Sequence, residues 1–222
     1  MSFLFPNKCV ACGEIIEDGV SVCENCRKTL YRIDRQCCKY CGRDIPLCGC
    51  LGKNNCFSRN VSVFRYDGSA GKIVKRYKMG KITQISVYIC KELSMLISEA
   101  YRDVYFDCMT FVPVSRVKKL FRGFDHAELI AKGVSEILGL ENTALLKRRF
   151  SFKPQKSLHT KEKRQKNIYG KFRAMKNVKG KTILLIDDVM TTGSTLNECA
   201  RVLKAAGAAD IFCATFAATY KK

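Results

Sequence analysis

Most of the chain beyond residue 60 alternates between short apolar runs and longer amphipathic stretches. Four apolar runs predict strands: VSVFRYD (61–67), CMTFVPVS (108–115), KTILLID (181–187) and DIFCATFAAT (210–219). Helical periodicity predicts helices in three places. The first stretch follows the 61–67 strand and continues through Ala100. The second covers residues 126–140 and is ended by Gly139, and the third covers residues 195–208. Uninterrupted apolar strands that alternate with helices predict an α/β domain whose parallel sheet is buried on both faces.

The first 58 residues lack this pattern. They contain little apolar sequence and ten of the 14 cysteines of the chain, all between Cys9 and Cys56. A segment this short cannot build a sufficient core unaided, so bound metal would supply part of its folding energy. We therefore predict a Cys-rich zinc-binding module over residues 1–58 and an α/β domain over residues 59–222.

The cysteine spacing predicts zinc. CVAC and CENC, ten residues apart, bring two thiolates each to one tetrahedral ion. The candidate ligands of this first site are Cys9, Cys12, Cys23 and Cys26. The candidate ligands of a second site are Cys38, Cys41, Cys48 and Cys50. Cys37 and Cys56 are alternative ligands there, so the number of zinc ions, one or two, and the pairing between the sites stay open.

Two adjacent carboxylates end the third predicted strand. Asp187 and Asp188 follow four apolar residues, and a segment of Thr, Gly and Ser separates them from the next helix. Ligands of parallel sheets bind at the carboxyl ends of the strands. The backbone N–H groups and hydroxyls of residues 191–195, at a helix N-terminus, suit a phosphate dianion, and Gly193 allows close approach.

Carboxylates beside a phosphate would repel it unless they bind hydroxyl groups or a hydrated Mg2+. A sugar phosphate with free vicinal hydroxyls satisfies both halves of such a site. A Walker loop is excluded, because no lysine lies between residues 187 and 195. The turn alone would also suit a helix N-cap, and the adjacent acids favour a ligand site instead.

The run ILLIDDVMTTGST (183–195) resembles the phosphoribosyl pyrophosphate (PRPP) signature of type I phosphoribosyltransferases. The resemblance implies that Asp187 and Asp188 bind the ribose hydroxyls, and that Mg2+ bridges these hydroxyls and the pyrophosphate. The residues implied for the 5-phosphate are Thr191, Thr192, Gly193, Ser194 and Thr195. VPVSRVKK (112–119) is similar to the pyrophosphate loop of that family, and the residues implied for pyrophosphate are Ser115, Arg116, Lys118 and Arg122.

The order of motifs over nearly the whole chain resembles the ComF family (ComFC/GntX-like proteins). The cysteine clusters are followed by FRYDGSAGKIVKRYK, VPVS...RGFDHAELIAK, KPQKSL...RQKNIYGKF and LLIDDVMTTGST. The resemblance implies a type I phosphoribosyltransferase fold behind a zinc module, and a role in competence for natural transformation, the handling of imported single-stranded DNA. This chain has Asp125 and His126 where many members have Asn-Gln, which would alter substrate preference if these positions touch the acceptor or pyrophosphate.

The implied reaction is phosphoribosyl transfer from PRPP with Mg2+. A nitrogen nucleophile displaces pyrophosphate at the anomeric carbon of the ribose, and positioning and charge stabilisation carry most of the catalysis. Two alternatives stay open. One is a catalytically inactive PRPP-sensing scaffold that binds DNA or a competence helicase. The other is a phosphoribosyltransferase of the purine- or nucleotide-salvage type.

A polar, basic segment spans residues 147–176 and contains twelve Lys or Arg against one acid. It stands where type I phosphoribosyltransferases have a mobile loop that closes over the reacting centre, so we expect a flexible loop at about 147–170. The residues that match the ComF-like loop pattern are Pro154, Gln155, Leu158, Arg164 and Asn167. We expect His159 to be an exposed loop residue without a catalytic task, and His126 to point at solvent or at a neighbouring side chain.

The net charge of +20 exceeds what solubility requires and is typical of chains that meet polyanions. Basic zinc knuckles with Tyr31, Tyr40 and Phe57 nearby suit single-stranded nucleic acid, although these aromatic rings would equally pack a small metal-centred core. No apolar run is long enough for a transmembrane helix, and we expect no signal peptide, because MSFLFPNKCVACGE has no basic region followed by a long apolar stretch. We expect a cytoplasmic protein, with peripheral attachment at the inner face of the membrane as the weaker alternative.

Overall fold

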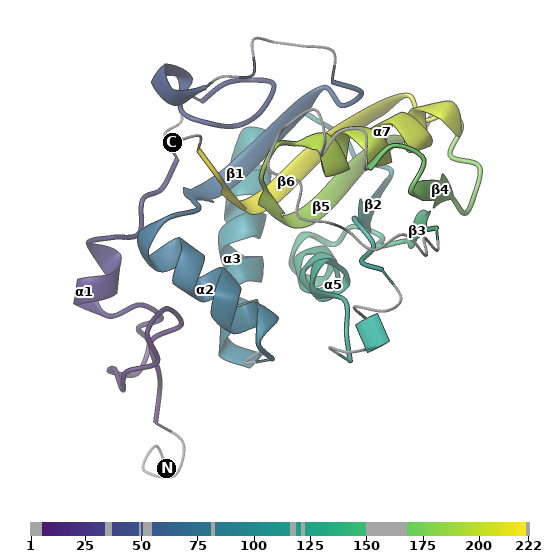
Figure 1. Cartoon of the computed structure of the whole chain (residues 1–222). Coiled ribbons are helices and arrows are strands. Elements are labelled where there is room, and N and C mark those ends of the chain that lie inside the picture. The colour runs from purple at the N-terminus through teal and green to yellow at the C-terminus, as the bar shows by residue number, and fades with distance from the viewer. Residues whose placement is uncertain are drawn as a thin grey trace.

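In the computed structural model, four parallel strands form the central sheet in the order β1-β6-β5-β2 (Figure 1). These strands are β1 (Arg59–Arg65), β2 (Cys108–Phe111), β5 (Thr182–Met190) and β6 (Asp210–Ala218). The structure describes residues 6–33, 37–48, 50, 55–80, 83–115, 119–120, 123–149 and 168–220. The predicted parallel sheet is confirmed, since each of the three strand pairs runs parallel.

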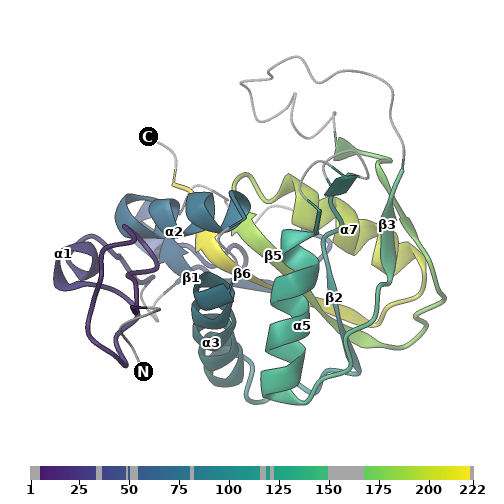
Figure 2. The same ribbon diagram turned by 90° about the horizontal axis from the view of Figure 1, so that it is seen from below.

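Helices cover both faces of the sheet. The helices α2 (Gly68–Lys78), α3 (Thr83–Ala100) and α5 (His126–Leu138) share one apolar core with Leu184 and Ile186 of β5. The helix α7 (Ser194–Ala205) packs on the opposite face, against Ile183 and Leu185. Figure 2 shows α3 and α5 side by side beneath the sheet. The four apolar residues of β5 are fully buried because successive side chains enter opposite cores.

Two predicted elements differ from the observed ones. The expected helical stretch through Ala100 consists of two helices, and Gly80, at φ 89°, lies beyond the end of the first. The expected strand at 108–115 pairs only as far as Phe111, and Pro113 has no N–H with which to continue a ladder. None of the described helices has the combination of length and apolarity that crossing a bilayer requires.

The ends of the basic segment are held together by a small antiparallel sheet. Its strands are β3 (Leu146–Arg148) and β4 (Phe172–Ala174), with Leu146 opposite Ala174. Residues 150–167 lie outside the described residues, and with them the loop residues Pro154, Gln155, Leu158, His159, Arg164 and Asn167. The expectation of a flexible loop therefore stays a prediction.

The N-terminal residues contact both cores of the α/β domain. The short helix α1 (Glu24–Arg27) follows Cys23, and the 3-10 helix η1 (Ile45–Leu47) precedes Cys48. Between them, Ile33 donates its N–H to the Val63 carbonyl (2.9 Å), so this part of the linker lies along β1. The first cysteine group packs into the core that α2 and α3 share, and the second packs into the core of α7.

Candidate functional site

The two acids lie where the central strand extends beyond its neighbour. β2 ends opposite Ile186, and Val112 donates its N–H to the Ile186 carbonyl at 3.0 Å. On its other side, β5 stays paired with β6 as far as Met190. Asp187 and Asp188 are therefore not at the very tip of β5, as the apolar run suggested. They occupy an edge of the strand that is open on the β2 side.

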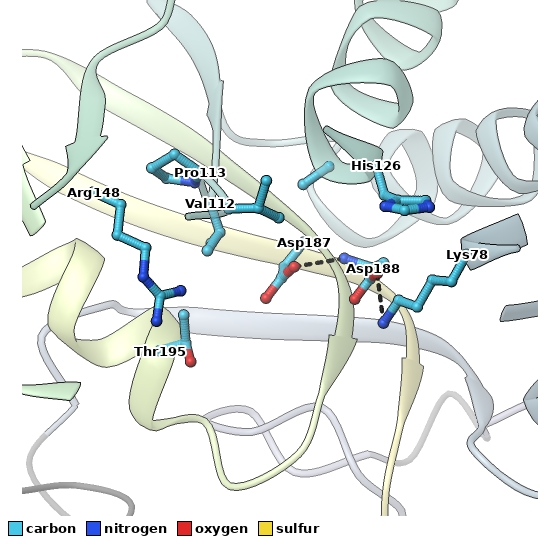
Figure 3. A pocket seen from close by; sticks show the side chains of 10 residues that line it. Lys78, Val112, Pro113, His126, Arg148, Asp187, Asp188 and Thr195 are labelled. Carbon is cyan, nitrogen blue, oxygen red and sulfur yellow. Dashed lines mark hydrogen bonds and ion pairs between the residues drawn. The ribbon is translucent and has the colours of Figure 1, made fainter. Parts of the chain in front are cut away.

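A cavity of about 200 Å³ opens at this edge. Figure 3 shows its lining from close by, with the two carboxylates at the centre and cationic side chains on either side. The lining residues are Lys78, Val112, Pro113, Val114, His126, Ala127, Arg148, Asp187, Asp188 and Thr195. Of the residues implied for PRPP, the cavity thus brings together both acids and Thr195.

One of the two acids forms an ion pair with a lysine. Lys78, the last residue of α2, places its Nζ 2.7 Å from Oδ2 of Asp188. Asp187 accepts the backbone N–H of Asp188 through Oδ1 (2.8 Å). Burial, and next the negative charge of Asp188, raise the pKa of Asp187 well above its usual value. Burial and the repulsion between the two carboxylates thus both disfavour the charge on Asp187.

Lys78 was missed from the sequence, although a signal was present. Helical spacing places it four residues after the buried Val74 and next to the buried Tyr77, on the apolar face of α2. A lysine on a buried helix face needs a partner, and here the partner is Asp188.

Arg148 is a second cation that sequence reasoning did not assign. It lies on the face of β3 that also carries the buried Leu146, and its guanidinium lies 5.4 Å from the centre of the Phe172 ring. Figure 3 shows this group reaching toward the side of the cavity where Thr195 lies. Burial lowers the pKa of Arg148, so an anion in the cavity would be a favourable partner.

The segment between β5 and α7 presents a helix N-terminus beside the acids. Gly193 is the N-cap residue of α7 at φ 78°, and it has no side chain with which to cap this turn. The hydroxyls of Thr192 and Ser194 lie 2.8 Å apart, and the Ser194 N–H points at the Thr192 hydroxyl (3.3 Å). Thr191 is exposed, whereas Ser194 is buried. These N–H and hydroxyl groups lie close together, in an arrangement that would suit an anion.

Asp125 and His126, which follow Phe124, both make contacts within the fold. Asp125 caps α5 by accepting the N–H groups of Ala127 (3.1 Å) and Glu128 (3.4 Å), and it accepts the Val114 N–H at 2.9 Å. It therefore ties the β2 wall of the cavity to α5. His126 is buried rather than turned to solvent, and the rings of Phe124 and Tyr77 meet it edge-on.

The residues implied for pyrophosphate are only partly visible. Ser115 is half-buried after the extended segment that leaves β2, and its carbonyl accepts the N–H of Lys119 at 2.9 Å. Arg116, Lys118 and Arg122 lie outside the described residues, so their role stays a prediction.

The eight predicted cysteine ligands form two separate groups of four. Within each group the sulfur atoms lie within 4.8 Å of one another. The Sγ atoms of Cys12 and Cys23 are 3.7 Å apart, and those of Cys38 and Cys50 are 3.5 Å apart. A tetrahedral zinc with Zn–S bonds of about 2.3 Å requires sulfur separations of about 3.8 Å, so both groups fit the ion.

The local backbone favours thiolate at one cysteine of each group, Cys9 and Cys38, whereas burial raises the thiol pKa of Cys12, Cys26, Cys41 and Cys48. Burial raises the pKa of the Cys9 thiol, but the N–H groups of Cys12, Cys23 and Ala11 outweigh it and lower the value to about 6. Cys37 and Cys56 belong to neither group of four. Cys56 instead uses its N–H to donate to Oδ1 of Asn197 on α7 (2.6 Å).

Two family models match this chain, one in its C-terminal half and one at its N-terminus. Residues 125–222 match the phosphoribosyl transferase domain, and residues 1–59 match the double zinc ribbon domain. Competence protein F of Haemophilus influenzae is 25% identical over 95% of this chain and 96% of its own length. Competence protein ComFC of Bacillus subtilis is 27% identical over 88% and 82%, respectively. DNA utilization protein YhgH of Escherichia coli is 25% identical over 93% and 94%.

This chain is similar over most of its length to the competence proteins F and ComFC. It combines a phosphoribosyltransferase domain with an N-terminal Cys-rich zinc ribbon module. The two cysteine groups account for the double zinc ribbon, and the acids and the loop before α7 lie within the segment that matches the transferase domain.

Proposed function

We propose that this protein is a member of the ComF family, that it binds PRPP with Mg2+ at the open edge of β5, and that it transfers the phosphoribosyl group of PRPP. One observation supports this most strongly. Two carboxylates, Asp187 and Asp188, share a cavity with Thr195 of the N-terminal turn of α7, and the N-cap residue of this turn is a glycine. Anion-binding N–H groups beside hydroxyl-binding carboxylates suit a sugar phosphate better than they suit an isolated phosphate or a cation.

The carboxylates would receive the ribose. When ionised, Asp187 and Asp188 only accept hydrogen bonds, so the two ribose hydroxyls are their natural donors. Mg2+, which prefers carboxylate oxygens and substrate phosphates, would be held by the same two residues and would neutralise charge on the pyrophosphate. Lys78 would then exchange its ion pair with Asp188 for a contact with incoming phosphate oxygens, because both are anionic partners within its reach.

The 5-phosphate would bind at residues 191–195. Gly193 adopts a left-handed conformation that turns the chain into α7, and the hydroxyls of Thr192 and Ser194 lie side by side there. The positive end of the helix dipole adds to the attraction. Thr195 lines the cavity, so its hydroxyl is the group of this loop nearest to the sugar.

Pyrophosphate would leave toward the basic wall. Arg148 lines the cavity, and Ser115 stands at the end of the neighbouring segment. The predicted contributions of Arg116, Lys118 and Arg122 would add to this wall. Cationic groups held in a partly desolvated cavity stabilise the charge that develops on the departing pyrophosphate, while the acids orient the ribose for attack at its anomeric carbon.

The role in the cell follows from the relatives. Two of them are named competence proteins and one a DNA utilization protein, and each matches nearly the whole chain. We infer that this protein also acts in the uptake or use of DNA, and the net charge of +20 supports direct contact with a single strand. A scaffold that binds PRPP without turnover, and recruits DNA or a helicase, would use the same cavity.

Pyrophosphate release tests the enzymatic form of the proposal. The zinc-loaded protein is incubated with PRPP, Mg2+ and a panel of nitrogen acceptors: purine and pyrimidine bases, ammonia and nucleotides. We expect release that requires one acceptor and that is lost in Asp188→Ala. Binding of PRPP without release for any acceptor would support the scaffold instead, and the absence of both binding and release would refute the proposal.

A further inference from the structure

The second zinc ribbon reaches the loop that precedes α7. Arg43 lies between Cys41 and Cys48 of the second cysteine group. Its guanidinium donates to two carbonyls, through Nε to Thr219 at 2.7 Å and through Nη2 to Thr191. Thr191 is the first residue of the proposed phosphate loop, and Thr219 follows the end of β6. One side chain of the ribbon therefore joins two chain segments that border the site.

The cysteine group holds this arginine in place. The Arg43 carbonyl accepts the Cys38 N–H at 2.7 Å, and the Cys38 carbonyl accepts the Gly42 N–H at 2.8 Å. These bonds close the knuckle between Cys38 and Cys41, the turn that two metal ligands would fix. The position of the guanidinium is therefore set by the same backbone that sets the thiolates.

The next residue fastens the knuckle to the domain. Asp44 is buried and accepts the hydroxyl of Tyr220 (2.7 Å) and Nε of Arg65 (3.0 Å) through Oδ2. The guanidinium of Arg65 also lies 5.4 Å from the centre of the Tyr220 ring. The Asp44 contacts end at β1 and at Tyr220, the residue after Thr219, so they fasten the backbone next to Arg43 to the domain.

The loop has few other anchors at its start. Thr191 is exposed, and its carbonyl is met by Arg43 and, at 3.4 Å, by the Thr219 hydroxyl. Past this point the hydroxyls of Thr192 and Ser194 bond to each other within the loop. Because Thr191 precedes the left-handed Gly193, its orientation sets the direction in which the N–H groups of the turn point.

The first cysteine group makes no corresponding contact among the residues that the structure describes. Thr29, three residues after Cys26, contacts the start of α2 instead. Its hydroxyl lies 2.8 Å from the Ser69 hydroxyl, and its carbonyl accepts the Ser69 N–H. The two ribbons are thus not equivalent with respect to the site.

We propose that Arg43 is a positioning residue of the 5-phosphate loop, and that metal binding at Cys38, Cys41, Cys48 and Cys50 sets the affinity of this loop for phosphate. The inference rests on the proposed function, because it assumes that residues 191–195 receive the 5-phosphate of PRPP. It adds that the second zinc ribbon is a structural control on that half of the site, and that the first is not.

Calorimetry with two probes separates this role from general destabilisation. Ribose 5-phosphate reports on the loop, whereas magnesium pyrophosphate reports on the leaving-group wall. We expect Arg43→Met to weaken ribose 5-phosphate binding about tenfold, since hydrogen bonds to charged groups are stronger than neutral ones. Pyrophosphate binding should stay unchanged. Arg43→Lys, with one ammonium in place of a two-armed guanidinium, should lose less.

Arg27→Met is the matched control. Arg27 lies exposed on α1 in the first ribbon, so this variant removes the same charge from the same module without touching the loop. Both variants should retain the zinc content of the wild type. Hydrogen exchange at residues 191–195 should be faster in Arg43→Met alone. If Arg43→Met binds ribose 5-phosphate as the wild type does, or weakens both probes equally, the positioning role is refuted.

Metal removal at the second site completes the test. Cys48→Ser should weaken ribose 5-phosphate binding as Arg43→Met does, and the double variant should lose no more than either single variant. Independent, additive losses would refute the coupling to the metal. If Cys48→Ser fails to fold, the Arg43 variants still decide. Failure of the wild type to bind PRPP or ribose 5-phosphate would instead refute the proposed function itself.

Discussion

Replacing Lys78 with methionine tests the electrostatics of the cavity. The ammonium lies 2.7 Å from Oδ2 of Asp188, with side chains that are 34% and 14% exposed, respectively. Exposed ion pairs contribute about 0.2–1 kcal/mol, whereas breaking a buried pair costs about 3–5 kcal/mol. This pair is intermediate, so Lys78→Met should lower the free energy of unfolding by about 2 kcal/mol. For a chain of this size, that corresponds to a fall in Tm of about 4–8 °C.

Magnesium ions should reverse this loss. Without Lys78, Asp188 lacks its ion-pair partner, and an added divalent cation is the natural replacement. Thermal melts in rising Mg2+ should therefore raise the Tm of Lys78→Met more than that of the wild type. Lys75→Met is the matched control, because Lys75 is an exposed residue in the last turn of the same helix.

The reasoning would be refuted by equal melting temperatures of the Lys78 and Lys75 variants. It would also be refuted by a magnesium response of Lys78→Met no larger than that of the wild type. Either result would mean that the ammonium does not compensate the charge of the acid pair.

Three further predictions concern other parts of the site. Burial and the charge of Asp188 raise the pKa of Asp187, and only the ionised carboxylate accepts the ribose hydroxyls. The affinity for PRPP, measured by calorimetry, should therefore fall about tenfold per pH unit as the pH drops below that pKa. The same measurement on Asp187→Asn should give a smaller dependence on pH. Metal analysis should give two zinc ions per chain, and one in Cys9→Ser with a lowered Tm; metal-free folded protein would contradict this. Asp125→Ala should cost about 1–2 kcal/mol in chemical denaturation through lost α5 capping, and an unchanged midpoint would contradict the capping role.

The local part of the site was predictable from sequence. Asp187, Asp188 and the loop through Thr195 are contiguous, so a buried strand followed by acids and a Gly-containing turn already indicates the arrangement. The two zinc groups were predictable for the same reason, since each CxxC knuckle is a local turn. Whether Cys37 or Cys56 replaces a ligand of the second site stayed open from the sequence, and both lie in the same short segment as the other candidate ligands.

The residues brought in from a distance were not predictable. Lys78, Arg148 and Arg43 reach the site or its loop from three separate elements, and only the packing of the helices and ribbons around the sheet brings them there. Strand ends were uncertain because pairing depends on the neighbour. β2 stops opposite Ile186, and that early end is what opens the edge beside Asp187. His126 is buried because Tyr77 and Phe124 enclose it, which helical periodicity alone does not reveal.

The most direct test of the account is a calorimetric titration of PRPP with Mg2+ into the zinc-loaded wild type and into Asp188→Asn. The substitution keeps the shape of the side chain but removes the charge that would hold the ribose and the metal. We predict one PRPP bound per chain in the wild type and affinity at least about tenfold weaker in the variant, the loss of a charged hydrogen bond. Equal affinity in the two proteins, or no heat of binding in the wild type, would contradict the central claim.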